Sequence, residues 1–221
     1  MKKIFTILIL SCLSICYSQT DAEFDGITME ICKSLNENKT YPDSTRISLS
    51  LEQHIPVFMQ NYNLETEEQL EAMLDKVYAR LQKNCNEFVE ILIKSDRNIS
   101  EWVLLEKAPV SKIQKKDCLR VTTAKQFYYL EYDGTKVHVT VENNKWTEKF
   151  EDGTYSILNF KWTGDCEYEL EFVESNNNIR KNLSSKSDKY NYVLYEAKEN
   201  DFKFYLKGKT ATVQATVLHA E

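Results

Sequence analysis

The chain has 221 residues, a formal net charge of −6 and 42% hydrophobic residues, with only 5 glycines and 3 prolines. This composition excludes collagen-like, low-complexity and mainly disordered chains, which need far more glycine and proline or far fewer apolar residues. The acidic balance argues against a nucleic-acid partner, because phosphate contacts need clustered lysine and arginine.

Residues 1–18 have the pattern of a secretory signal peptide. Lys2 and Lys3 precede an apolar run over residues 4–15, and the small residues that follow indicate cleavage before Gln19. The run is shorter than the ~20 residues that span a membrane, and no later segment approaches that length. We therefore expect an exported protein, periplasmic or secreted, without a transmembrane segment. A lipid anchor on one of the signal's two cysteines, Cys12 or Cys16, is the alternative.

Four cysteines follow the signal: Cys32, Cys85, Cys118 and Cys166. An even number in an exported chain predicts two disulfides. Of the three connectivities, we favour Cys32–Cys85 and Cys118–Cys166, because each pair then stays inside one half of the chain. Four free thiols are the alternative reading. We expect no metal site, because the chain has no C-x-x-C and no histidine lies near a cysteine in the sequence.

Residues 19–115 are predicted to form a helical domain. An apolar stripe recurs at spacings of three and four over Phe24, Ile27, Ile31 and Leu35. Residues 36–44 are polar and contain a proline, which predicts a loop. Residues 50–62 would form a second, shorter helix that Pro56 weakens.

The clearest helix is expected to begin at Thr66, with Gln69 at the spacing of a capping box. One face then stays apolar as far as Leu92, for about seven turns. Cys85 lies on that face and Cys32 borders the first stripe, so a bridge would clamp the two helices and contribute roughly 3–4 kcal/mol. Two further segments are predicted to be short helical or irregular pieces: residues 101–107 and 110–115.

Residues 116–221 alternate with a period of two and are rich in aromatic and β-branched side chains, which predicts an antiparallel β domain. Eight strands are expected, over residues 125–132, 136–142, 145–150, 154–163, 165–173, 190–197, 202–207 and 210–218. Asp-Gly and Asn-Asn pairs between them suit tight hairpins. The fold class is therefore α+β, with a meander that is curled or closed into a small, lipocalin-like barrel. The polar segment 174–189 is predicted to be a long exposed loop.

Alternation also predicts which side chains face the interior. One strand places Cys166, Tyr168, Leu170 and Phe172 inward and Glu167, Glu169 and Glu171 outward. The other inward rows are expected to be Ser156, Leu158, Phe160 and Trp162; Phe202, Phe204 and Leu206; and Val213 with Val217.

Residues that could carry chemistry are few. The outward glutamate row could bind a cation, but calcium sites need ligands that converge from several directions, so a solvated surface is the simpler interpretation. His54, His138 and His219 have no recognisable nucleophile or orienting partner in the sequence. No catalytic or nucleotide-binding motif is present, and no cofactor is expected.

The aromatic side chains of the β domain allow two interpretations. Trp146, Phe160 and Trp162 could line a pocket for an apolar ligand, as in ligand-holding eight-stranded barrels. Alternatively, the aromatic residues only fill the interior, which in a barrel of this size barely accommodates its own side chains. We favour the filled core.

The segment from Trp162 to Leu170 has the pattern W-x-x-D-C-E-Y. Together with Cys118 at the start of the β half, it resembles a motif of small exported or lipid-anchored bacterial proteins of uncharacterised function. The helical half, with cysteines on two helices, resembles exported helical domains. In the β group a basic, glycine-containing segment follows the first cysteine, whereas residues 118–123 keep Arg120 and lack the glycine. The resemblance implies no activity, and it supports the pairing of Cys118 with Cys166.

Three functions are consistent with these observations. The first is a non-enzymatic envelope or extracellular protein that binds a protein, glycan or lipid partner. The second is a lipocalin-like carrier of a small apolar molecule, which requires a cavity lined by Trp146, Phe160 and Trp162. The third, a hydrolytic enzyme, would need a cleft with converging polar groups.

Overall fold

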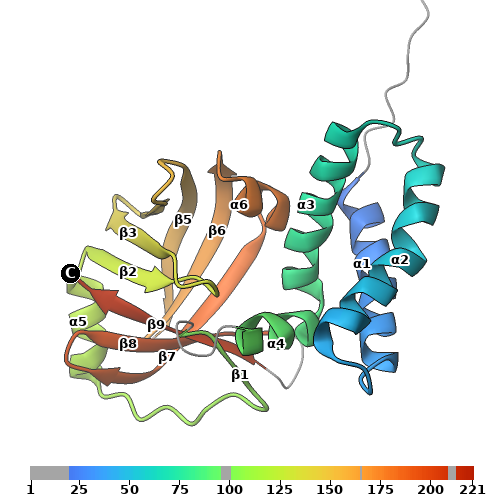
Figure 1. Cartoon of the computed structure of the whole chain (residues 1–221). Helices are drawn as coiled ribbons and strands as arrows, with labels where there is room; N and C mark the ends of the chain where they lie inside the picture. Colours follow the sequence, from blue (N-terminus) through green and yellow to red (C-terminus); the bar gives the residue numbers. More distant parts are fainter. Residues whose placement is uncertain (1–19, 96–100, 165, 209–212) are drawn as a thin grey trace, which may run out of the picture.

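A computed structural model describes residues 20–95, 101–164, 166–208 and 213–221. The predicted signal peptide, with its two cysteines, lies outside the described residues. Figure 1 shows a group of helices beside a strongly curled sheet. The predicted α+β fold class and the antiparallel barrel are confirmed.

The helical unit consists of α1 (Asp21–Glu37), α2 (Asp43–Asn61), α3 (Glu67–Asn84) and α4 (Asn86–Ser95). Capping boxes start two of these helices. At α1, the Thr20 hydroxyl accepts from the Glu23 N–H while the Glu23 carboxylate accepts from the Thr20 N–H. Thr66 and Gln69 make the same pair of bonds at α3, as their spacing predicts.

The helices enclose a core of their own. The predicted stripe of α1 is buried against apolar residues of the other helices, among them Ile55, Phe58, Met73, Val77, Leu81 and Phe88. A disulfide joins Cys32 on α1 to Cys85, with 5.5 Å between the two Cα atoms. This core shares no residue with the core of the barrel, so the chain builds two separate apolar interiors.

The predicted continuous helix from Thr66 to Leu92 is wrong, because the chain breaks at Cys85. That residue has φ −131° and ψ 99°, which ends α3, and its sulfur accepts a hydrogen bond from the Phe88 N–H at the start of α4. The half-cystine therefore caps the next helix while its disulfide holds it against α1. Apolar periodicity continues through the break, which is why the sequence does not reveal it.

The second helix is longer than predicted. α2 begins at Asp43, directly after Pro42, and continues through Pro56. Proline removes one helical hydrogen bond, but the neighbouring side chains of Ile55 and Phe58 are buried in the helical core. Packing of this face maintains a helix that local propensity alone disfavours.

The barrel is built from eight antiparallel strands: β2 (Gln126–Leu130), β3 (Lys136–Glu142), β4 (Lys145–Lys149), β5 (Tyr155–Gly164), β6 (Glu167–Ser175), β7 (Lys189–Lys198), β8 (Asp201–Leu206) and β9 (Val213–Ala220). Each strand pairs with the next in the chain, and β9 returns to pair with β2, which closes the ring. Closure leaves no open edge among these strands.

The hairpin turns contain the asparagine and glycine residues that were predicted to form them. Asn143 and Asn144 between β3 and β4 both have positive φ. Gly134 and Gly153 have φ of 83° and 82°, in the left-handed region that glycine adopts without a steric penalty.

Three shorter elements differ from prediction. Residues 103–105, expected to be helical or irregular, form strand β1 (Val103–Leu105), which pairs with β9 and so already belongs to the sheet. The helix α5 (Lys115–Thr123) precedes the first barrel strand. The supposed loop 174–189 contains the end of β6 and the helix α6 (Asn178–Leu183). These elements are too short for apolar periodicity to identify them.

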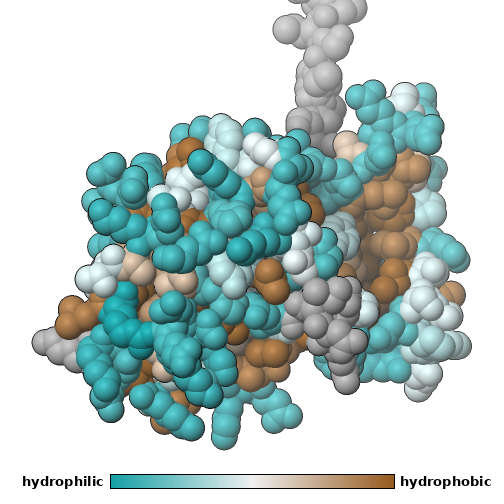
Figure 2. All heavy atoms as spheres, turned by 60° about the vertical axis from the view of Figure 1, so that its left-hand side comes forward, coloured by the Kyte–Doolittle hydropathy of each residue, from teal (hydrophilic) through white to brown (hydrophobic). Residues whose placement is uncertain are grey.

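The predicted inward rows of β5, β6 and β8 are correct, with Leu158, Tyr168, Leu170, Phe202 and Phe204 buried in the barrel core. The inward row predicted for the last strand, Val213 with Val217, is wrong. On β9 the side chains that face the barrel interior are Gln214, Thr216 and Leu218. Val213 is nevertheless buried, because β1 pairs across that part of β9. The outer barrel surface in Figure 2 is mostly hydrophilic, as expected from this alternation.

One end of the barrel is covered by α5. Its Val121 is buried in the barrel core, and Cys118 forms a disulfide with Cys166 at the start of β6. The Cα atoms of this pair are 5.1 Å apart. Both disulfides therefore join the cysteines that the sequence analysis pairs. Within the described residues, no helix has the length and apolar character needed to cross a membrane.

Candidate ligand cavity in the barrel

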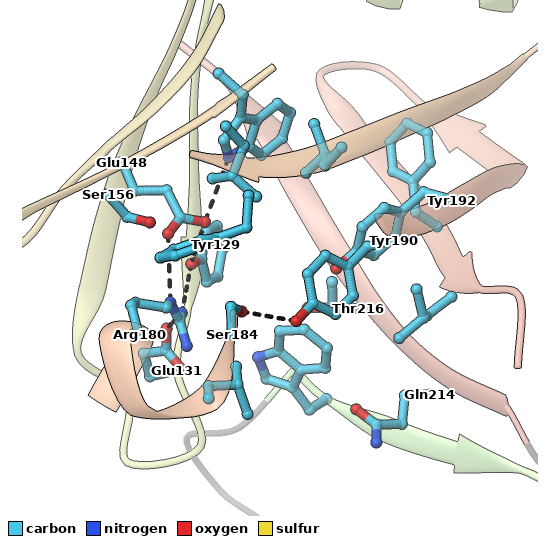
Figure 3. Close-up of a pocket in the computed structure, with 18 of the residues that line it drawn as sticks. Tyr129, Glu131, Glu148, Ser156, Arg180, Ser184, Tyr190, Tyr192, Gln214 and Thr216 are labelled. Carbon is cyan, nitrogen blue, oxygen red and sulfur yellow. Dashed lines mark hydrogen bonds and ion pairs between the residues drawn. The ribbon is translucent and has the colours of Figure 1, made fainter. Parts of the chain in front are cut away.

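A cavity of about 170 Å³ lies inside the barrel at the end opposite α5, next to α3 and α6 (Figure 3). Its wall is mainly apolar and aromatic, with contributions from Trp102, Tyr129, Tyr132, Trp146, Tyr168, Leu170, Phe172, Tyr192 and Phe204. Polar side chains enter the same space from β4, β5, β9 and α6. An apolar wall with a few converging polar groups is the usual composition of a small-molecule site.

Arg180 enters the cavity from α6. Asn177 caps this helix by accepting from the Arg180 N–H at 3.1 Å, and its amide donates to the Thr154 hydroxyl at 2.9 Å. These bonds attach α6 to the start of β5. The short helix therefore projects its arginine into the barrel from a fixed position.

The Arg180 guanidinium is bonded to two carboxylates and one phenol. Its Nε lies 3.3 Å from a Glu148 oxygen, its Nη2 donates to the Tyr129 hydroxyl at 2.7 Å, and Nη2 also contacts Glu131. The Tyr129 hydroxyl donates to Glu148 at 3.0 Å, and the Trp146 indole N–H lies 3.3 Å from the same carboxylate oxygen. One positive and two negative groups thus form a single network at the cavity wall.

Burial dominates the proton equilibria of this network. It raises the pKa of the Glu131 carboxyl, an effect that the Arg180 charge only partly offsets and that the nearby Glu148 reinforces. Burial also raises the pKa of the Tyr129 hydroxyl well above its usual value. For Arg180 burial works against the charge, but Glu131, Tyr129 and Glu148 outweigh it and raise the pKa. The arginine is therefore always charged, and the phenol stays a neutral donor.

Two hydroxyls of the cavity have no hydrogen-bond partner among the described residues: Ser156 Oγ and Thr216 Oγ1. Ser156 is only 1% exposed and lies directly across the β4–β5 ladder from Glu148. Thr216 lies on β9, four strands from β5 in either direction around the eight-stranded ring. The two hydroxyls therefore lie on opposite walls, as Figure 3 shows. Leaving such a group unpaired costs about 1–3 kcal/mol.

The helical unit forms part of the cavity mouth. Gln82 and Lys83 of α3 line the cavity together with Leu183 and Ser184 of the α6 segment. Lys83 is paired with Asp188 at 2.6 Å, and Arg80 donates to the Leu183 carbonyl at 3.3 Å. These contacts join the two units at the opening through which a ligand would pass.

Arg80 itself is held by the helical unit. Its guanidinium pairs with Asp25 of α1 at 2.5 Å, so the side chain that reaches the α6 segment is already fixed in position. Two more contacts join the same surfaces: Ser185 with Asp21, and Asn178 with Asp75.

The three predicted ligand-lining residues lie together around a second, smaller cavity. Trp146, Phe160 and Trp162 all line a space of about 90 Å³ against α5, and of the three only Trp146 also lines the 170 Å³ cavity. Trp146, Tyr168 and Leu218 line both, so they form the layer that separates them. Trp146 and Tyr168 are stacked with their ring centroids 5.8 Å apart. The aromatic residues thus fill the middle of the barrel and leave space at its ends.

The other candidate residues lie outside the cavity. Glu167 and Glu169 form ion pairs with Lys207 and Lys189 on the outer surface. Among the described residues, no cluster of histidine, cysteine, aspartate and glutamate could hold a metal ion. The glutamate row is therefore an ordinary charged outer face.

The three histidines differ in their surroundings. His138 is half-exposed, 3.2 Å from Glu221. His219 lies between Glu101 and Asp201, at 2.7 Å from each. His54 belongs to α2 in the helical unit, and its Nε2 is buried without a partner in the described structure. None of the three lines the barrel cavities.

The polar part of the cavity, formed by Glu148, Ser156 and Arg180, is not evident from the sequence as a whole. Glu148 could have been found, because it lies two residues after the inward-facing Trp146 on one strand. Ser156 was placed inward, but its lack of a partner depends on three-dimensional packing. Arg180 gives no signal, since it lies in a polar segment that resembles a loop.

The chain matches no protein-family model and no curated protein.

Proposed function

We propose that the protein is a non-enzymatic binding protein that carries one small, mainly apolar molecule inside the barrel. The unpartnered hydroxyls of Ser156 and Thr216, on opposite walls of the cavity, are the observation that supports this most. A ligand with polar groups near its ends would satisfy both hydroxyls, while its apolar body contacts the aromatic wall.

The size of the cavity limits the ligand. An engineered apolar cavity of about 150 Å³ takes up benzene, so a space of about 170 Å³ suits a molecule built on one ring. Fatty acids and other long-chain lipids are too large to be enclosed there. Of the functions considered from the sequence, the carrier of a small molecule has the most support.

The binding test uses a neutral one-ring probe, 2-phenylethanol, and isothermal titration calorimetry. Leu206 lines the cavity near its mouth and is partly exposed, so Leu206→Trp should block entry while the barrel still folds. Tyr205→Trp is the matched control, because Tyr205 lies on the outer face of the same strand against Tyr195. We expect the parent and the control to bind the probe and L206W to bind at least about tenfold more weakly. Equal binding by all three proteins would place the ligand elsewhere and refute the proposal.

We further propose that the protein works outside the cytoplasm, as the signal-like residues 1–18 predict. The two disulfides support this location, because such bonds persist mainly in oxidising compartments. N-terminal sequencing of the native protein should find Gln19 first. A native protein that retains Met1 and has alkylatable thiols would contradict export.

A further inference from the structure

The charges around the cavity indicate which ligands it favours. Arg180 is bonded to both Glu131 and Glu148, so when both carboxylates are ionised the network carries one excess negative charge. Lys83, the other cation at the wall, is already paired with Asp188. Among the described residues that line it, the cavity therefore has an unbalanced carboxylate and no unpaired lysine.

Three of the five N–H donors of Arg180 are directed at protein acceptors. Nε is directed at Glu148, and Nη2 is shared between Tyr129 and Glu131. A ligand carboxylate would have to compete with two protein carboxylates for one guanidinium and would add a third negative charge in a poorly solvated space. Such like-charge crowding is strongly unfavourable.

A cation would instead find several favourable partners. Glu148 and Ser156 are paired residues on the adjacent strands β4 and β5, so their side chains lie next to each other on the inner face of the barrel. Both present oxygens that can accept a hydrogen bond. The rings of Tyr129, Trp102 and Trp146 line the same cavity, and aromatic faces attract ammonium groups. Burial, reinforced by the charge of Glu148, raises the pKa of Glu131 by more than the charge of Arg180 offsets.

We infer that the cavity selects a small arylalkylamine, with its ammonium group at Glu148 and Ser156, over a carboxylic acid of the same size. The ring would lie among the aromatic side chains, and a polar substituent at the far end would reach Thr216 on the opposite wall. This inference rests on the proposed function, because it names the ligand class of the same cavity.

The test compares three probes of one shape: 2-phenylethylamine, 2-phenylethanol and 3-phenylpropionate. Calorimetry at neutral pH should show that the amine binds at least about tenfold tighter than the alcohol and that the acid binds most weakly. Tyramine is 2-phenylethylamine with an added hydroxyl at the far end of the ring. It should bind more tightly than 2-phenylethylamine to the parent, whereas Thr216→Val should bind the two amines with equal affinity.

Two conservative variants locate the charge effect. Glu148→Gln keeps the shape of the side chain and should remove most of the preference for the amine over the alcohol. Glu131→Gln should reduce the same preference, and it provides a second reading if E148Q fails to fold. Circular dichroism confirms the fold of each variant.

The outcomes separate the inference from the proposed function. Equal binding of alcohol and amine, or tightest binding of the acid, would overturn the inference and leave a small-molecule carrier in place. Failure of every probe to bind would overturn both. Preference for the amine that persists in both glutamine variants would also overturn the inference, because the selectivity would then not come from these carboxylates.

Discussion

The helical unit and the barrel treat their buried hydroxyls differently. In the helical unit, the Ser50 hydroxyl donates to Ser34 at 2.9 Å and Thr28 donates to the Asp25 carbonyl at 3.0 Å. In the barrel, Ser156 and Thr216 have buried hydroxyls without partners in the described structure, beside an open space. The helical unit thus pairs these buried hydroxyls, whereas the barrel retains two hydroxyls that reduce stability and that a ligand would satisfy.

Buried charge shows the same contrast. Arg46 of α2 lies 2.5 Å from Glu87 and 2.6 Å from Asp43, and the other oxygen of Glu87 pairs with Lys39 at 2.6 Å. Two cations therefore balance two carboxylates there, and the pKa of Glu87 is lowered even though burial opposes it. At the barrel cavity negative charge is in excess, and burial, reinforced by Glu148, raises the pKa of Glu131. Substitutions in the two units test this difference.

The largest effect is expected from removal of Arg180. Arg180→Leu leaves Glu131 and Glu148 without a cation and should lower the free energy of unfolding by about 3–5 kcal/mol at neutral pH, as measured in urea. The triple variant R180L/E131Q/E148Q should regain most of that loss. A loss below about 1 kcal/mol in R180L would mean that the network contributes little to the barrel.

Each disulfide should contribute nearly as much to the free energy of unfolding. The bridges close segments of similar length, with sequence separations of 53 and 48. The double variants C32S/C85S and C118S/C166S should therefore each lose about 4 kcal/mol on unfolded-chain entropy alone. Limited proteolysis should cut first within the helical unit in one variant and within the barrel in the other. Identical cleavage patterns would contradict two separately stapled units.

His219 links the barrel to the segment before it. Burial lowers its pKa, but hydrogen bonds to Glu101 and Asp201 outweigh burial and raise it overall; the ring also stacks on Tyr128, over which Lys136 lies. Because the pKa of His219 is higher in the folded protein, protonated His219 stabilises the fold. This stabilisation is complete below the unfolded pKa of 6.5 and is lost as the pH rises through the folded pKa.

The corresponding test follows urea unfolding between pH 5 and pH 9. The parent should lose roughly 1 kcal/mol more than His219→Gln as the pH rises, because both carboxylate contacts are partly screened by solvent. Parallel pH profiles would show that folding does not raise the pKa of His219.

The smallest effect concerns the contact between the units. Lys83→Ala removes the pair with Asp188 and should cost less than about 1 kcal/mol, with most of the difference lost at high salt. Chemical denaturation at low and high salt measures it. A salt-independent loss would show that Lys83 acts through the packing of its alkyl chain.

Much of the fold could be predicted because alternation and helical periodicity are strong over long segments. All eight barrel strands were expected near their observed positions, since Tyr168, Leu170 and Phe172 have the period of a half-buried strand. In contrast, β1 has only three residues and α5 has nine, less than three helical turns, so neither shows a clear period.

The polar half of the site was harder to predict for a physical reason. Arg180 reaches the cavity only because α6 is attached to β5 and α3, contacts that connect residues far apart in the chain. The unpaired state of Thr216 depends on packing across the barrel and on the register of β9, which the apparent row of Val213 and Val217 obscured.

The most direct test of the central claim is the urea unfolding of S156A/T216V beside the parent, with and without 2-phenylethylamine. Without the amine, the variant should be more stable by about 2–6 kcal/mol, because two hydroxyls that each cost about 1–3 kcal/mol when unpaired leave the interior. With the amine, the parent should be stabilised and the variant much less so. A variant that is less stable than the parent, and that the amine stabilises equally, would contradict the claim that these hydroxyls are kept for a ligand.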